Sequence, residues 1–162
     1  MAARGASVVR DRSAAWLLAA IVVLVVVALD QLAKGLVRGA IPPGGSREVI
    51  GPLTFVHVHN RGVAFGFLGG GGLPVLLVTA AALALLVGYF ARHPDRPYLW
   101  LPTGMLLGGA LGNLLDRLRQ GFVTDFIHLP HWPAFNVADM CITGGVIALV
   151  LVLERHGRTA AA

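Results

Sequence analysis

Four apolar stretches divide the chain, and each is long enough to form a helix that crosses a membrane. Each has 16–19 residues, and together they cover Ala14–Leu29, Leu73–Ala91, Tyr98–Leu115 and Val137–Leu153. At about 1.5 Å per residue, and with apolar flanking residues, such stretches span a hydrocarbon core of about 30 Å. The pattern predicts four transmembrane helices, at about residues 14–37, 73–91, 98–117 and 137–155.

The segments between the stretches are short, and one of them favours β-structure. Residues 38–72 are the longest, and within them Thr54–His59 is rich in β-favouring residues and predicts a strand. The run Gly69–Gly72 predicts a flexible joint before the second helix. Residues 118–136 have room for one short helix or turn. We therefore expect an all-α membrane protein, one domain over residues 1–162, with a small β-element on the membrane surface.

Composition supports a membrane protein and excludes several other classes. Hydrophobic residues make up 56% of the chain and charged residues 13%, against about 25% charged in soluble domains. The first stretch follows three arginines, as in a signal peptide, but it exceeds the usual length of about 7–15 residues, so we expect it to be retained. The single cysteine, Cys141, leaves no internal disulfide.

The basic residues flank the stretches and predict the orientation. The net charge of +5 comes from scattered arginines, which suits lipid headgroups and not nucleic acid. Seven basic residues lie on the side of the two termini and six on the other side, where the segments are longer. We expect both termini in the cytoplasm. The polar clusters at the ends of the first and third stretches, and at the start of the fourth, then share the extracytoplasmic face.

Two of these clusters contain pairs of side chains on one helix face. Asp30 and Lys34 are four residues apart and can form an ion pair, either to neutralise the end of the helix or as part of a site. Asn113 and Arg117 have the same spacing. Arg117 either anchors to headgroups or holds a carboxylate or carbonyl group, and Asp116 beside it is a candidate salt-bridge partner.

Asp125 and Asp139 are candidate catalytic groups. Asp125 lies among apolar residues, where loss of hydration raises the pKa of a carboxyl group. Asp139 lies three residues after Asn136, which is also an ordinary helix start with Asn136 as the N-cap. The alternative is that the two carboxyl groups meet across the bundle and share a proton, one as general base and one as general acid. The spacing alone leaves both interpretations open.

Histidines offer a weaker alternative chemistry. A metal site is conceivable from four of them, but the chain has no His-Glu-x-x-His pattern, so we expect no metal site. These residues are His57, His59, His128 and His131.

Taken together, the motifs resemble the lipoprotein signal peptidases, also called signal peptidase II. The matching segments, in the family's order and spacing, are Asp30-Gln-x-x-Lys34, Asn60-x-Gly-x-Ala-Phe65, Gly108-Gly-x-x-Gly-Asn-x-x-Asp-Arg117-x-x-x-Gly121-x-Val123-x-Asp125-Phe and Phe135-Asn-x-Ala-Asp139.

The resemblance implies a four-helix inner-membrane aspartyl endopeptidase with a small extracytoplasmic β-element and a short surface helix. It implies cleavage of prolipoprotein signal peptides just before a cysteine that carries diacylglycerol, without a cofactor or an obligate protein partner. Its substrate would be a diacylglyceryl-modified prolipoprotein in a bacterial cell membrane, next to membrane lipids. Asp125 and Asp139 match the catalytic aspartates. The supporting positions match Asp30, Lys34, Asn60, Gly109, Asn113, Arg117 and Asn136.

Two other classes remain open from the residues alone. Ionisable side chains at membrane depth also mark transporters and proton relays. Against this, the polar groups gather at one face of the membrane. The third possibility is an assembly factor without catalysis, in which the aspartates would be dispensable.

Overall fold

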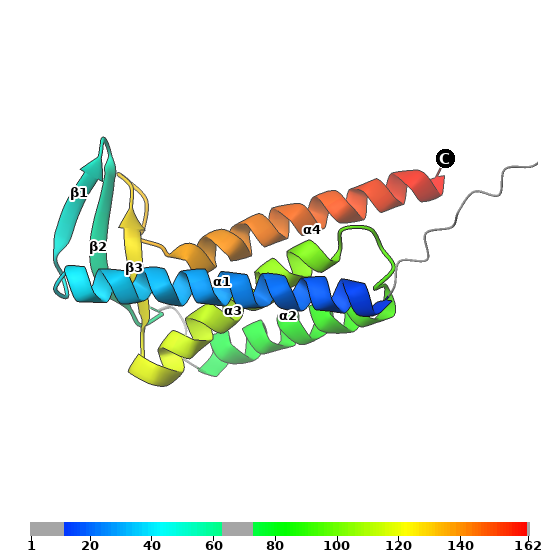
Figure 1. Cartoon of the computed structure of the whole chain (residues 1–162), viewed down its shortest axis with the longest axis horizontal. Coiled ribbons are helices and arrows are strands. Elements are labelled where there is room, and N and C mark those ends of the chain that lie inside the picture. The colour runs from blue at the N-terminus through cyan, green and yellow to red at the C-terminus, as the bar shows by residue number, and fades with distance from the viewer. Residues whose placement is uncertain (1–11, 63–72, 162) are drawn as a thin grey trace, which may run out of the picture.

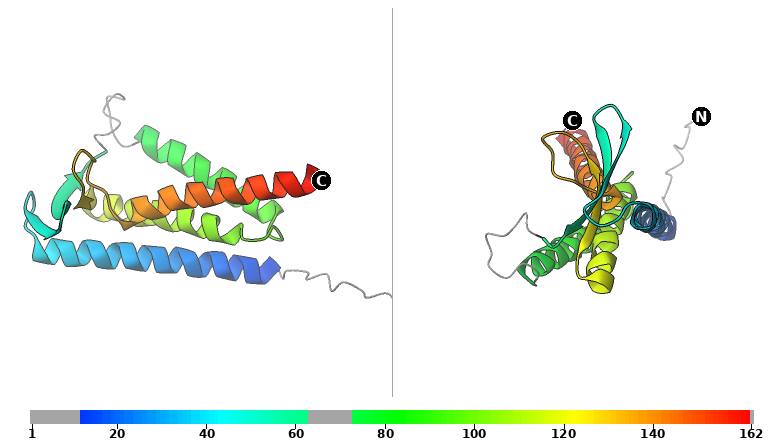
Figure 2. Two further views of the ribbon diagram at one scale, coloured as in Figure 1. Left: turned by 90° about the horizontal axis from the view of Figure 1, so that it is seen from above. Right: turned by 90° about the vertical axis from the view of Figure 1, so that its left-hand side faces the viewer.

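In the part of the chain that the structure describes there are four long helices, with a small sheet across one end of the bundle (Figure 1). This computed structural model describes residues 12–62 and 73–161. The elements are α1 (Arg12–Ala40), β1 (Ser46–Ile50), β2 (Leu53–Asn60), α2 (Leu73–Arg92), α3 (Trp100–Gln120), β3 (Val123–His128) and α4 (Val137–Ala161). The start of α1 and the end of α4 both lie at the end of the bundle away from the sheet, as Figure 2 also shows.

The helix α3 packs against the other three helices, and its glycines allow the closest approaches. A Cβ added at Gly104 would lie 2.6 Å from Val22 Cβ in α1, and one at Gly109 would lie 2.6 Å from the carbonyl oxygen of Ala138 in α4. Non-bonded carbon atoms prefer separations of about 3.5–4.0 Å. Larger residues at these two positions would therefore push the helices apart.

The sheet is antiparallel, with the order β1-β2-β3, and it is fixed to the end of α1. Phe126 of β3 packs with Val37 of α1 and with Ile41, the residue that follows α1, and its ring meets Phe55 of β2 edge to face with centroids 6.0 Å apart. The N–H groups of Phe126 and Ile127 donate to the carbonyl oxygen of Phe135 at 3.0 and 2.8 Å. These bonds hold β3 next to the start of α4.

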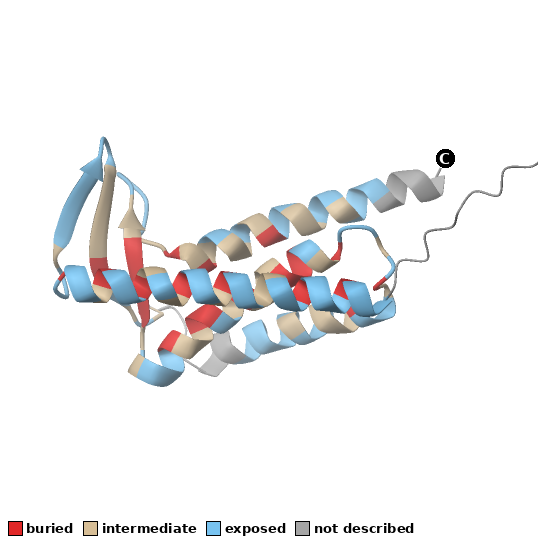
Figure 3. Cartoon of the chain, in the orientation of Figure 1, coloured by how far each residue is buried: buried red, intermediate tan, exposed pale blue. Residues whose placement is uncertain are grey.

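The outer faces of the helices are apolar, as expected for a protein surrounded by lipid. Large side chains such as Leu24 and Leu85 are 68% and 76% exposed, while buried residues line the inner faces (Figure 3). Within the described residues, α1 and the part of α4 at Val137–Arg155 are long and apolar enough to cross a membrane. In α2 the corresponding apolar segment, Leu77–Arg92, is shorter. In α3 the hydropathy is lowered by glycines and by the polar residues near its end.

The four predicted helices are confirmed as helices, within a few residues of their predicted ends. The strand predicted at Thr54–His59 is confirmed as part of β2. For residues 118–136 the sequence predicts one short helix or turn: a turn forms at Leu129–Trp132, and Val123–His128 pairs with β2 as a third strand that the sequence does not predict. β-branched and aromatic residues favour that pairing. The proposed joint at Gly69–Gly72 lies outside the described residues.

Candidate active site

The polar residues singled out in the sequence gather where the sheet meets α1, α3 and the start of α4. Lys34 is fully buried, and its ammonium group contacts three oxygens: Asp30 Oδ2 at 2.8 Å, Asp116 Oδ2 at 3.2 Å and Asn113 Oδ1 at 3.0 Å. An ammonium group has three N–H donors, so all three find an acceptor. The predicted Asp30–Lys34 pair is confirmed, and it belongs to a larger cluster that links α1 to α3.

The two carboxylates that hold Lys34 also bind backbone N–H groups of other elements. Asp30 Oδ1 accepts from the N–H of Ala138 at 2.9 Å, in the first turn of α4. Asp116 Oδ2 accepts from the N–H of Thr124 at 3.0 Å, in β3. The ion cluster therefore fixes the starts of α4 and β3, and these two elements carry Asp139 and Asp125.

One expectation for the end of α3 needs correction. Asp116 does not serve as the salt-bridge partner of Arg117: it is fully buried and faces Lys34, with the guanidinium of Arg38 at 3.8 Å. Arg117 is exposed, and its guanidinium donates to the backbone carbonyl of Asn113 at 3.5 Å. A helix places positions 109, 112, 113 and 116 on one face, and that spacing could have identified Asp116 as part of the site.

Asp125 is buried, and it accepts one hydrogen bond on each carboxyl oxygen. Asn60 Nδ2 donates to Oδ2 at 2.9 Å, and Asn136 Nδ2 donates to Oδ1 at 2.7 Å. Burial raises the pKa of Asp125 to about 6; the bonds from Asn60 and Asn136 oppose this rise, and the charge of Asp139 adds to it. Near neutral pH this group is therefore ready to exchange a proton.

Asp139 caps α4 and also contacts the polar cluster. Its N–H donates to Asn136 Oδ1 at 3.0 Å, and its Oδ2 accepts from the N–H of Asn136 at 3.2 Å, which is a reciprocal helix cap. Its other oxygen, Oδ1, accepts from Asn113 Nδ2 at 2.8 Å. The capping interpretation is confirmed, and the same carboxyl group is also part of the polar cluster.

Asn136 and Asn113 connect the two aspartates. The Asn136 side chain donates to Asp125, its backbone N–H donates to Asp139, and its Nδ2 lies 3.2 Å from Asn113 Oδ1. Because Lys34 donates to the same Asn113 oxygen, the amide nitrogen of Asn113 must face Asp139. The two carboxyl groups are therefore oriented by fully or nearly fully buried amides.

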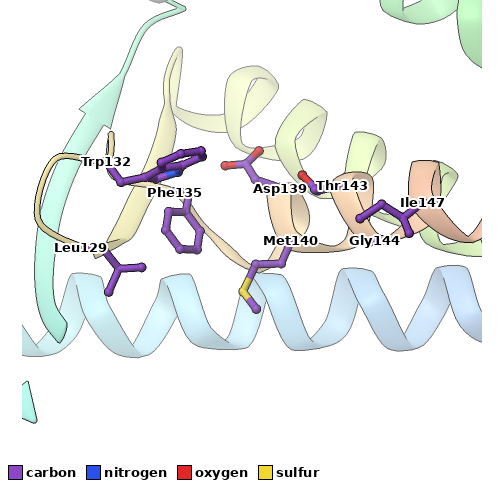
Figure 4. Close-up of a pocket in the computed structure, with 8 residues that line it drawn as sticks. All are labelled: Leu129, Trp132, Phe135, Asp139, Met140, Thr143, Gly144 and Ile147. Carbon is purple, nitrogen blue, oxygen red and sulfur yellow. The ribbon is translucent and has the colours of Figure 1, made fainter. Parts of the chain in front are cut away.

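A groove with an apolar lining opens at Asp139. Its volume is about 520 Å³, and in Figure 4 the carboxyl group of Asp139 lies among the side chains that line it. At one end the lining comes from the loop before α4, and at the other from the outer face of α4. The lining residues are Leu129, Trp132, Phe135, Asp139, Met140, Thr143, Gly144 and Ile147. The groove thus places a carboxyl group beside an apolar surface.

The remaining predicted positions have other roles in the fold. Gly109 lies at the contact between α3 and α4, one turn before Asn113, and does not present a polar side chain. Within residues 12–62 and 73–161, no group of three or more His, Cys, Asp or Glu residues is placed to hold a metal ion. The four-histidine site considered from the sequence is therefore not formed. Phe65, in the second matched motif, lies outside the described residues.

Comparisons with known proteins find relatives along most of this chain. The family model described as signal peptidase (SPase) II matches residues 22–154. A lipoprotein signal peptidase of Moorella thermoacetica is 48% identical over 130 residues, which cover 78% of this chain and 85% of that protein. One of Syntrophomonas wolfei is 44% identical over 132 residues, covering 80% and 89%. A solved structure described as a bacterial membrane enzyme superimposes with a TM-score of 0.77 at 32% identity, covering 83% of this chain and 91% of that one.

Proposed function

Since this chain belongs to the signal peptidase II family, we propose that it removes signal peptides from prolipoproteins with Asp125 and Asp139 as its catalytic groups. Membership of the family makes the chain a membrane protease of lipoprotein processing. The observation that carries the assignment of the catalytic groups is the contact of one buried residue, Asn136, with both carboxyl groups. That contact holds two ionisable groups of different exposure side by side, one buried and one lining the groove.

The chemistry requires one carboxylate and one carboxylic acid. The carboxylate removes a proton from water as the water oxygen bonds to the peptide carbonyl carbon, while the acid donates its proton to the carbonyl oxygen. As the C–N bond breaks, the aspartate that took the proton from water gives it to the leaving nitrogen. The product on the carbonyl side of the bond keeps a carboxyl group. Asp125 suits an exchange of this kind, because its pKa of about 6 lies close to neutral pH.

The surrounding residues keep the two carboxyl groups in place during this exchange. Asn60, Asn113 and Asn136 each donate an amide N–H to one of the two groups, so neither carboxyl group is free to rotate away. Lys34 fixes the orientation of Asn113 and forms ion pairs with both Asp30 and Asp116. The cluster acts as a rigid support for the two aspartates.

The membrane arrangement that fits this function has four spans. The helices α1 and α4 are long and apolar enough to cross a bilayer, and α2 and α3 lie beside them in the same bundle. Both termini would then be cytoplasmic, with the sheet and the aspartates at the extracytoplasmic face. The apolar groove at Asp139 lies along the outer face of α4, where lipid chains can reach it from the side. We propose that cleavage occurs just before a cysteine that carries diacylglycerol.

The test is a cleavage assay with purified protein in detergent and a lipid-modified prolipoprotein, followed as a gel shift. We expect cleavage at the lipid-modified cysteine, and we expect it to continue when a metal chelator is present. Absence of cleavage by a folded protein would favour a transporter or an assembly factor. Loss of activity with the chelator, restored by zinc, would contradict a mechanism based on two aspartates.

A further inference from the structure

His57 and His59 form a second cluster of potential ligands, separate from the carboxyl groups. They lie two positions apart on β2, so both side chains are on the same face of the strand. Their Nε2 atoms are 3.3 Å apart. His57 is buried, with 4% exposure, whereas His59 is exposed and stacks on Phe122 with ring centroids 3.8 Å apart. Neither ring takes part in the peptidase mechanism proposed above.

We propose that His57 and His59 form a binding site for one divalent transition-metal ion such as Zn²⁺ or Cu²⁺, with water completing the coordination. Imidazole nitrogen is a preferred ligand of these ions, whereas Mg²⁺ and Ca²⁺ prefer oxygen.

The distances fit two ligands of one ion. Zn–N bonds are about 2.0–2.1 Å long, so two nitrogens at a tetrahedral angle are about 3.3–3.4 Å apart. The observed separation is 3.3 Å. With bonds of that length, two rings that point at a common ion would have their centroids about 5.1–5.2 Å apart. Two rings joined by a straight N–H···N hydrogen bond would have their centroids about 5.6 Å apart. The centroids are 5.0 Å apart, which agrees with the convergent arrangement.

The hydrogen bond from His57 to Ile41 leaves a lone pair on His57 Nε2, which lies within hydrogen-bond distance of His59 Nε2, so a bound ion would take the place of the proton between the two rings. His57 Nδ1 lies 2.7 Å from the carbonyl oxygen of Ile41, and a carbonyl oxygen only accepts, so Nδ1 carries the proton. The lone pair is then on Nε2, which faces His59. A backbone carbonyl that fixes the tautomer in this way is typical of metal-binding histidines. His59 is held by its stacking on Phe122, so both ligands are oriented before an ion binds.

The site would bind its ion reversibly and more weakly than a structural zinc site. A structural site has four protein ligands, and the described residues contain no third His, Cys, Asp or Glu in position. Arg61 is two residues from His59, and its positive charge also opposes a cation. Because Asn60 follows His59 and donates to Asp125, an ion on the two rings would restrain β2 next to the candidate catalytic group.

The experiment is a Zn²⁺ titration by calorimetry, with full-length protein in detergent, no polyhistidine tag and metal-free buffer. His59→Ala is the main variant because it leaves the bond between His57 and Ile41 intact. His131→Asn is the control: it also removes an exposed imidazole, and asparagine tolerates the positive φ of 63° at that position. We expect one ion to bind to the wild type and to His131→Asn, and the affinity of His59→Ala to fall at least about tenfold.

A second measurement separates binding at the site from a change in folding. Zn²⁺ should raise the melting temperature of the wild type and of His131→Asn but not that of His59→Ala, because a ligand of the native state stabilises it. Equal affinity of His59→Ala and the wild type, or no binding of either Zn²⁺ or Cu²⁺ to the wild type, would overturn the proposal. Neither readout depends on peptidase activity.

Discussion

Asn136 explains how one residue serves both the fold and the candidate chemistry. Its side-chain oxygen caps α4, its backbone N–H holds Asp139, and its amide nitrogen holds Asp125. A residue that only capped a helix would leave its Nδ2 for solvent. Here Nδ2 is buried and bound to a carboxylate. At the scale of single residues, the start of α4 and the candidate site therefore share Asn136.

Replacement of either aspartate by asparagine should abolish cleavage without unfolding the protein. The amide keeps the shape of the side chain but neither removes nor donates a proton in the required way. We expect Asp125→Asn and Asp139→Asn each to retain less than about a tenth of the wild-type rate, a barrier increase of more than about 1.4 kcal/mol. The gel-shift assay measures this. Asp95→Asn, in the exposed loop before α3, is the control and should keep full activity. More residual activity in either of the first two variants would rule out the pair as catalytic groups.

The raised pKa of Asp125 predicts a specific dependence of stability on pH. Between the reference pKa of 3.8 and about 6, the folded state holds the proton of Asp125 more tightly than the unfolded state does. The contribution of this residue to stability therefore falls as the pH rises from about 4 to 6, and is constant above that range.

Asp125→Asn removes this dependence. Melting temperatures of the two proteins are measured in the same detergent from pH 4 to pH 8. The melting temperature of the variant should rise relative to that of the wild type up to about pH 6. A difference that does not change with pH would show that the pKa of Asp125 is not raised.

Loss of the buried ammonium group of Lys34 should destabilise the protein strongly. Lys34→Met leaves Asp30 and Asp116 buried without their common partner, and removal of one member of a buried ion pair costs about 3–5 kcal/mol. Arg38→Met is the matched comparison. Arg38 is 29% exposed and lies 3.8 Å from Asp116, so its loss should cost much less. Thermal unfolding in detergent measures the stability of both variants. An equal loss of stability in the two would contradict the central role of Lys34.

At the scale of elements, the glycines of α3 set how closely α1 and α4 approach the site. Asp30 on α1 reaches the N–H of Ala138 on α4 across α3, and this is possible only because α3 has no side chains at the crossing points. A Cβ added at Gly112 would lie 2.7 Å from Asp30 Oδ2. The small residues of α3 thus allow the ion cluster to form.

Two glycine-to-alanine substitutions should change stability in opposite directions. Gly104→Ala places a methyl group 2.6 Å from Val22 Cβ, and overpacking of this kind costs about 1–3 kcal/mol. Gly35→Ala, on the exposed side of α1, meets nothing within 4 Å and should gain up to about 1 kcal/mol from helix propensity. Melting temperatures in the same detergent compare the two. A stable Gly104→Ala variant would show that the contact between α1 and α3 adapts.

At the scale of the whole molecule, the position of the site relative to the apolar surface decides how a substrate would reach it. The aspartates lie at the sheet end of the bundle, and the groove, which Asp139 lines, runs along the outer face of α4. A substrate with acyl chains in the bilayer would therefore meet the site at a constant depth.

This geometry predicts that the lipid on the substrate is required. Two acyl chains contribute about 0.8 kcal/mol per buried CH₂ group and hold the adjacent peptide next to the groove. The same prolipoprotein without its diacylglyceryl group should be cleaved poorly or not at all in the gel-shift assay. Equal cleavage of both forms would indicate a general membrane protease with no requirement for the lipid.

The sequence alone determined the features that depend on local spacing. Hydrophobic runs predicted four helices, the i,i+4 spacing predicted the pair of Asp30 and Lys34, and the Asn136–Asp139 spacing gave a helix cap as one of two interpretations. The motifs also predicted the family. The helices, the ion pair and the cap follow from the period of one helix or from residues close together in the chain. These local relations do not change when the helices pack.

Only the tertiary structure decided the contacts between distant segments. Asp116 faces Lys34 and not its neighbour Arg117, because α3 turns that side toward α1. Val123–His128 is a strand because β2 offers it an edge, and Asn136 reaches Asp125 because that strand lies beside α4. A side chain takes the partner that burial and hydrogen bonding favour after the elements have packed, and that choice depends on residues up to about a hundred positions away.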